Sequence, residues 1–159
     1  MQILTTIVAL AVGIAGTFPS AFAKPQLSKR DEVHCGTTDD ATLSDCRALI
    51  DNRDNWNAAF AGNDNLCHYT NPQDLKFNYP AYNTACRGEC CVYYASGDSD
   101  EGPVPNAETI RSRAAGLLGC GDTGSNKVNA LGVAGDGSGV CISNGDGCGD
   151  CFDDSDFIN

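Results

Sequence analysis

The stretch that decides the fold reads Cys86-Arg-Gly-Glu-Cys90-Cys91-Val92-Tyr93-Tyr94. Adjacent cysteines seldom bridge each other, because a disulfide needs Cα atoms about 4.4–6.8 Å apart. The valine and tyrosines that follow favour a β-strand. Successive side chains of a strand point to opposite faces, so Cys90 and Cys91 would each tie the strand to a different neighbour. The sequence therefore predicts a central strand with one disulfide on each face.

The first 23 residues have the pattern of a secretory signal peptide. An almost unbroken apolar run is followed by Ala21-Phe22-Ala23, which matches a small-residue cleavage site ending at Ala23. The run is shorter than the ~18 residues that a membrane-spanning helix needs. We therefore expect residues 1–23 to direct the chain out of the cell.

A short polar segment, residues 24–30, ends in the dibasic pair Lys29-Arg30. This pair resembles the sites that kexin-type proteases cut, although it also fits two unrelated surface charges. On the first interpretation 24–30 is a propeptide and 31–159 is the secreted domain, with an acidic tail from Phe152 that is at most partly ordered.

All ten cysteines lie after residue 30. An even number in a small secreted chain predicts up to five disulfides and a single domain, with the pairing left open. The C-x-x-C spacing at 148–151 also fits a redox dithiol, and cysteines with His34 and His68 also fit a zinc site, but both need reduced thiols. The disulfide candidates are Cys35, Cys46, Cys67, Cys86, Cys90, Cys91, Cys120, Cys141, Cys148 and Cys151.

The charge is strongly negative. The formal net charge is −11, and it becomes −14 when residues 1–30 are removed, since they carry three basic residues and no acidic one. Such a chain does not fit phosphate backbones or anionic membranes. We expect a monomer with no nucleic-acid partner, no membrane span and no cofactor; attraction to a cationic partner, such as chitosan or a basic protein, remains an alternative.

Two amphipathic helices are predicted. The first begins at Thr42, with Asp45 completing the cap, and the polar residues 51–55 end it. The second is capped by Asn106 and ends at Gly119 in a left-handed conformation, with Arg111 and Arg113 directed to solvent. Their apolar stripes are Leu43, Cys46, Leu49 and Ile50, and Ala107, Ile110, Ala114, Leu117 and Leu118.

Strands are predicted at 66–69 and in a hairpin of 127–133 with 140–142, around a Gly-rich turn. Residues 71–85 are expected to be irregular apart from a short strand at 75–79, and the Gly-rich end, 145–151, is expected to lack regular structure. The predicted fold is a small, disulfide-stapled α+β domain: an antiparallel sheet carrying 92–94, 128–133 and 140–142, with two helices packed on it.

The sequence offers few recognisable catalytic or metal-binding motifs. With two histidines and no G-x-S-x-G motif, no catalytic residue stands out, and the acidic loop at 98–102 lacks the spacing of an EF-hand. A buried position suits the lone Trp56 best. If exposed, Trp56, Tyr79, Tyr93 and Tyr94 would form a stacking surface for cell-wall polysaccharide.

Two sets of residues carry a family resemblance. Cys35-Gly36, the segment 43–50, Trp56 and Cys67 resemble the start of fungal necrosis-inducing effector homologues. The segments 90–93, 118–120 and 140–148 are similar to fungal small secreted cysteine-rich proteins called WD-like, and more distantly the layout is similar to the killer toxin of smut fungi. The resemblance implies a secreted protein that acts without catalysis on a host or competitor, and it assigns no active residue. A wall-binding module and a small secreted hydrolase are the alternatives.

Overall fold

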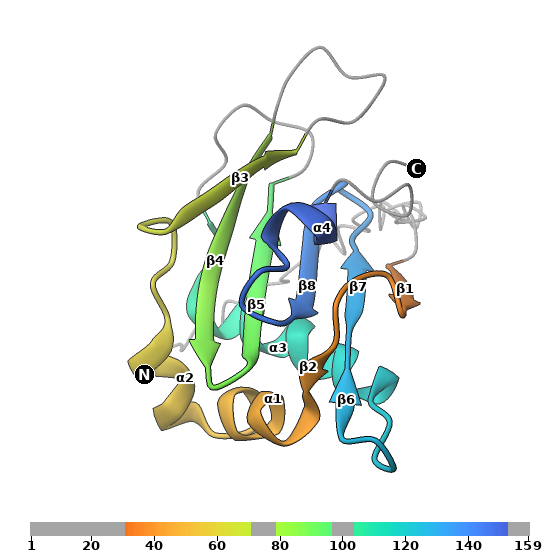
Figure 1. Ribbon diagram of the computed structural model, residues 1–159. Helices are drawn as coiled ribbons and strands as arrows, with labels where there is room; N and C mark the ends of the chain where they lie inside the picture. The colour runs from red at the N-terminus through yellow and green to blue at the C-terminus, as the bar shows by residue number, and fades with distance from the viewer. Residues whose placement is uncertain (1–30, 71–78, 97–103, 153–159) are drawn as a thin grey trace, which may run out of the picture.

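The computed structural model describes residues 31–70, 79–96 and 104–152 (Figure 1). The expected signal peptide, propeptide, acidic loop at 98–102 and the tail from residue 153 lie outside these ranges. The elements, in chain order, are β1 (Glu32–Cys35), β2 (Ala41–Thr42), α1 (Leu43–Ile50), α2 (Arg53–Ala59), β3 (Leu66–Thr70), β4 (Tyr79–Arg87), β5 (Cys90–Ala95), α3 (Ala107–Leu117), the 3-10 turn η1 (Leu118–Cys120), β6 (Lys127–Val128), β7 (Ala130–Val133), β8 (Gly139–Ser143) and α4 (Cys148–Phe152).

Six strands form one sheet in the order β1-β7-β8-β5-β4-β3, and every neighbouring pair is antiparallel. A separate two-stranded sheet joins β2 to β6. The predicted α+β class and the strands at 66–69, 92–94 and 140–142 are confirmed. The strand predicted at 127–133 is divided: β7 pairs with β8 in the six-stranded sheet as predicted, but β6 belongs to the separate sheet with β2. The irregular connection expected at 71–85 is wrong from residue 79 onward, since β4 covers Tyr79–Arg87 and pairs with strands on both sides. Ladder hydrogen bonds on two sides outweigh the weak β-propensity of its alanines and asparagine. Residues 71–78, with most of the short strand expected at 75–79, lie outside the described ranges.

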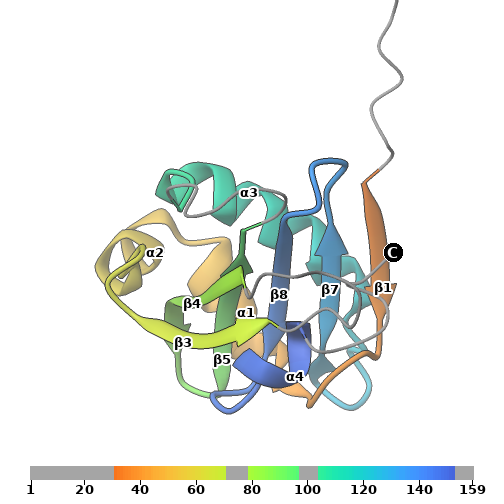
Figure 2. The same cartoon turned by 90° about the horizontal axis from the view of Figure 1, so that it is seen from above.

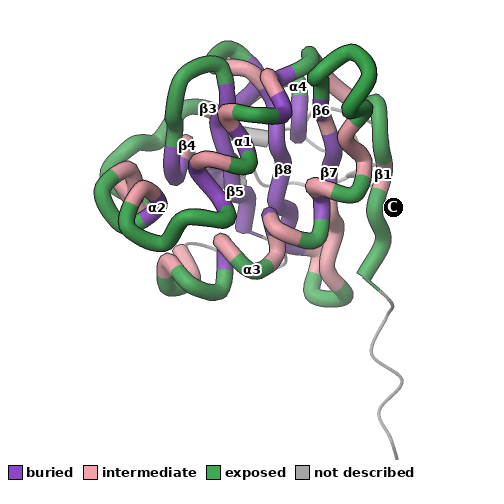
Figure 3. Tube along the Cα trace, turned by 90° about the horizontal axis from the view of Figure 1, so that it is seen from below, coloured by how far each residue is buried: buried purple, intermediate pink, exposed green. Residues whose placement is uncertain are grey.

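β5 lies at the centre of the sheet, and all six of its residues are buried. Cys90, Val92 and Tyr94 face the core formed with α1, α2 and α3. Cys91, Tyr93 and Ala95 face a second core under α4. Figure 2 shows α3 and α4 on opposite sides of the sheet, and Figure 3 shows β5 and β8 buried between them while β1 is exposed. Successive β5 side chains therefore enter opposite cores, as predicted from the alternation of side chains along a strand.

All ten cysteines are paired, as Cys35–Cys120, Cys46–Cys90, Cys67–Cys148, Cys86–Cys91 and Cys141–Cys151. The prediction that adjacent Cys90 and Cys91 serve separate bridges on opposite faces is confirmed. Cys90 is bonded to α1, and Cys91 is bonded across the hairpin to β4. Cys148 and Cys151 bond to two other partners, so the C-x-x-C segment is not a redox dithiol.

The polar segment that was expected to end the first helix instead starts another one. The side-chain oxygen of Asn52 accepts the backbone N–H groups of Asp54 and Asn55, which makes Asn52 the N-cap of α2. Thr42 begins α1 but makes no cap hydrogen bond, because its hydroxyl donates to Glu89. The first helix was thus predicted correctly in position but not in its cap, and α2 was missed.

The two helix ends predicted near the C-terminus also differ. α3 continues into η1 and closes with the Gly121 N–H donating to the Leu118 carbonyl, and Gly119 is not among the residues with a positive φ. The Gly-rich segment contains α4, which two disulfides tie to β3 and β8. Phe152 on α4 is fully buried, so it belongs to the core rather than to a loose tail.

The β4–β5 hairpin depends on Gly88. Cys90 pairs with Arg87, leaving Gly88 and Glu89 as a two-residue turn, and Gly88 has a φ of +57°. The Asp45 carboxylate accepts the Glu89 N–H at 3.0 Å, and a Cβ on Gly88 would lie 2.3 Å from its Oδ2. Position 88 therefore requires glycine for two reasons: its backbone is in the left-handed region, and a Cβ would collide with Asp45 of α1.

Gly88→Ala is expected to lower the free energy of unfolding by at least about 2 kcal/mol: roughly 1 from the left-handed backbone and 1 or more from displacing Asp45. Gly36→Ala is the matched control, because Gly36 has a φ of +78° and nothing within 4 Å of a Cβ. It is expected to show the backbone cost alone in urea unfolding. Equal losses in the two variants would contradict a role for Asp45.

An ion-pair cluster on the surface links α2 to α3. Glu108 accepts hydrogen bonds from Arg111 at 2.7 and 3.0 Å and from Arg53 at 3.0 Å. The Arg111 bonds, followed by Arg53, lower the pKa of Glu108 from 4.5 to about 2. Arg111 also donates to the Ile50 carbonyl, so this side chain lies along the protein and not toward solvent as predicted.

Because the folded pKa of Glu108 is depressed, its contribution to stability is present above about pH 4.5 and is lost as the pH falls to about 2. We expect Glu108→Gln to lower the urea midpoint near pH 6 and to have little effect near pH 2. An equal decrease in the urea midpoint at both pH values would show that the contribution of Glu108 to stability does not depend on its charge.

Candidate functional site

The predicted aromatic surface is not formed. Trp56 and Tyr93 are fully buried and Tyr94 is 6% exposed, because they fill the two cores. The side chain of Tyr79 lies outside the described residues. Sequence reasoning missed Tyr69, which is 53% exposed on the edge strand β3. Three of the four residues proposed to stack on sugars therefore serve packing.

A zinc site built on cysteines is also ruled out, because every cysteine sulfur is in a disulfide. Within residues 31–70, 79–96 and 104–152, no three His, Cys, Asp or Glu side chains gather in a way that would hold a metal ion.

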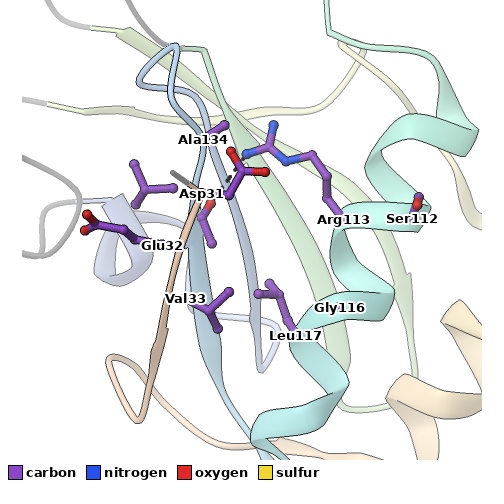
Figure 4. A pocket seen from close by; sticks show the side chains of 10 residues that line it. Asp31, Glu32, Val33, Ser112, Arg113, Gly116, Leu117 and Ala134 are labelled. Atoms are coloured by element: carbon purple, nitrogen blue, oxygen red, sulfur yellow. Dashed lines mark hydrogen bonds between the residues drawn. The ribbon is translucent and has the colours of Figure 1, made fainter. Parts of the chain in front are cut away.

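A pocket of about 300 Å³ lies between the edge strand β1, its neighbour β7 and helix α3 (Figure 4). β1 extends the sheet beyond the helix that covers it, so the gap under this edge stays open. Val33 of β1 is 54% exposed, and Leu117 of α3 is buried. The lining residues are Asp31, Glu32, Val33, Ser112, Arg113, Gly116, Leu117, Gly132, Val133 and Ala134.

Two glycines set the size of the pocket. A Cβ on Gly132 would lie 3.0 Å from Leu117 Cδ2, so glycine lets α3 approach β7 closely at this point. Gly116 is on the exposed side of α3, and a Cβ there would meet nothing within 4 Å. The base of the pocket is thus close-packed, and its wall at Gly116 has room for a larger side chain.

Arg113 is the central polar group of the pocket. Its guanidinium donates to the hydroxyl of Ser138 at 2.9 Å and to the carbonyls of Ser138 and Gly132 at 3.0 and 3.4 Å. It therefore holds the turn between β7 and β8 against α3. Burial lowers its pKa, and the negative charges of Asp136 and Asp31 oppose that effect. The guanidinium remains a cation surrounded by acceptors and acids.

The mouth of the pocket is acidic. Figure 4 shows the Asp31 and Arg113 side chains pointing toward one another. The Asp31 carboxylate accepts the Gly135 N–H at 3.3 Å, and Asp136 accepts the backbone N–H and the hydroxyl of Ser138. These bonds orient two carboxylates around one arginine. The pocket therefore combines an apolar base with one lining carboxylate, Asp31, that faces Arg113, and the charge of Asp136, outside the lining, also acts on this arginine.

Sequence reasoning placed Arg113 in solvent and did not find the pocket. One feature of the sequence does indicate that Arg113 is partly covered. Residue 113 follows Ile110 by three positions and precedes Leu117 by four, which places it beside the apolar stripe of the helix. Its acceptors come from residues 132 and 138, and β1 reaches β7 through the pairing of Glu32 with Val133. The Arg113 contacts span 19 to 25 residues and the pairing of Glu32 with Val133 spans about a hundred, and no local pattern reveals either.

No family model, no curated protein and no solved structure matches this chain. In the part that the structure describes, no helix has the length and apolar character needed to cross a bilayer. Five disulfides in a domain of this size are typical of small, extracellular, cysteine-rich proteins.

Proposed function

We propose that the chain is a secreted protein that acts outside the cell without catalysis, by binding a component of a host or a competing organism, in the manner of cysteine-rich effectors and toxins. The resemblance of its cysteine-bearing segments to fungal proteins of this type supports the proposal. So does its amino-terminal segment, which has the pattern of a signal peptide followed by a dibasic site.

The disulfide arrangement is the observation that carries this proposal. Cys46–Cys90 joins α1 to β5 in one core, and Cys141–Cys151 joins β8 to α4 in the other, with all four cysteines fully buried. Cys35–Cys120 and Cys67–Cys148 attach the two edge strands to distant parts of the chain. A protein bonded through every layer keeps its surface in one shape without a large core, which suits recognition outside the cell.

The test is a dose–response of cell viability on plant leaf tissue and on competing fungi. The sample is the protein secreted from a eukaryotic host, with an intact mass that shows ten hydrogens lost to disulfides. A reduced and alkylated sample is the control. Killing by the oxidised protein alone is the expected result, and no effect at micromolar doses would overturn the proposal.

A further inference from the structure

We propose that the pocket between α3 and β1 binds a lysine or arginine side chain presented by a basic segment of a partner protein. This inference names the chemistry of the partner in the function proposed above, and it rests on that function only for its biological setting. Three features carry it: the shape of the pocket, the charge of its rim and its position at the edge of the sheet.

The pocket fits a side chain that is apolar along its length and charged at its end. Its volume of about 300 Å³ is at the lower limit of ligand-binding pockets. Val33, Leu117 and Val133 give it an apolar surface. The methylene groups of lysine or arginine pack on such a surface while the charged end remains near the rim.

The charge at the rim favours a cation over an anion. The guanidinium of Arg113 is already engaged by three acceptors, so an anion would have to displace those bonds. It would also meet the carboxylate of Asp31, which lines the pocket, and the negative charge of Asp136, which acts on Arg113 from outside the lining. The net charge of −11 adds attraction for a basic partner at longer range.

The location of the pocket suits an extended partner segment. Among the strands of residues 31–70, 79–96 and 104–152, β1 is the last of the sheet, and its pairing with β7 uses one of its two edges. An extended peptide can add to such an edge through its backbone, while one side chain enters a neighbouring pocket. The pocket lies under this edge, so backbone pairing and insertion of a basic side chain are geometrically compatible.

The test is titration of the ¹⁵N-labelled, secreted protein with blocked tripeptides, followed by amide chemical shifts. Gly-Lys-Gly and Gly-Arg-Gly are the probes, Gly-norleucine-Gly is the apolar control, and Gly-Glu-Gly is the anionic control. We expect the basic peptides to shift residues 112–117 and 131–135, and the norleucine and glutamate peptides to bind at least about tenfold more weakly.

Three variants locate the binding. Gly116→Leu puts a side chain into the pocket, and Gly119→Leu makes the same change one turn further on, where a Cβ also meets nothing within 4 Å. Loss of the shifts in the first variant and their retention in the second is the expected result. Asp31→Asn removes a rim carboxylate and is expected to weaken binding about tenfold, the effect of losing a charge-assisted hydrogen bond.

Equal binding of the glutamate or norleucine peptide would overturn the proposal, as would shifts spread over the acidic surface and unchanged in Gly116→Leu. Failure here is distinguishable from failure of the proposed function. If Gly116→Leu still kills cells as the native protein does, the pocket is not the means of action, although the protein remains a toxin.

Discussion

Removing the Cys46–Cys90 disulfide, in the variant Cys46→Ala/Cys90→Ala, is expected to lower the free energy of unfolding by about 4 kcal/mol. The bond closes a loop of 44 residues, and the chain-entropy estimate grows with the logarithm of loop length. Both cysteines are fully buried in the core that α1, α2 and α3 share with the sheet. The variant should therefore also be secreted in lower yield, since a small disulfide-bonded domain has little stability to lose.

The matched control is Cys86→Ala/Cys91→Ala, which removes a bridge of only five residues within one hairpin. The same relation gives a loss of about 2 kcal/mol there. Urea unfolding of both variants, followed by far-UV circular dichroism, measures the difference. A hairpin variant that loses as much as the Cys46–Cys90 variant would contradict loop length as the source of stabilisation.

Trp56→Ala is expected to cost about 3–5 kcal/mol, as large-to-small changes at buried aromatic positions do. Trp56 is fully buried, and its indole N–H donates to the Ala107 carbonyl at 2.9 Å, so one side chain fastens α2 to the start of α3. The truncation leaves a cavity and a carbonyl without its donor. Urea unfolding at neutral pH measures the loss.

Tyr69→Ala is the control for an aromatic on the surface, because Tyr69 is 53% exposed. Its expected effect is within about 0.5 kcal/mol. A Trp56→Ala protein of native stability would mean that α2 does not depend on this contact. The large expected cost also means that a loss of polysaccharide binding in Trp56→Ala would report unfolding, and Tyr69→Ala is the informative change for that test.

Local patterns predicted much of the sheet and the two longest helices. The apolar run from Cys90 to Ala95 is unbroken because β5 is buried on both faces, and the stripe of Ile110, Ala114 and Leu117 is strong because α3 is covered on one side only. α2 and α4 were missed for a physical reason. Each is short, of seven and five residues, and owes its helical form to a cap or to disulfides rather than to an apolar stripe.

The pocket could not be predicted for a different reason. It exists because the sheet order brings the first strand beside the seventh, which places Asp31 and Val33 next to Arg113. The sequence contains the residues but not the order of the strands. The disulfide pairing cannot be read from the sequence for the same reason: five other cysteines, Cys46, Cys67, Cys86, Cys90 and Cys91, lie between Cys35 and its partner Cys120.

That pairing constrains the timing of biosynthesis. Translation adds about 5–20 residues per second, so Cys35 would enter an oxidising compartment on the order of ten seconds before its partner, 85 residues later. Cys46 and Cys67 arrive sooner and are available for wrong bonds. Only Cys86–Cys91 and Cys141–Cys151, with separations of 5 and 10 residues, can close as they emerge. Maturation of this chain should therefore depend on a disulfide isomerase. A host that lacks one should accumulate mispaired forms in which Cys35 is not bonded to Cys120 and β1 is therefore not attached to η1.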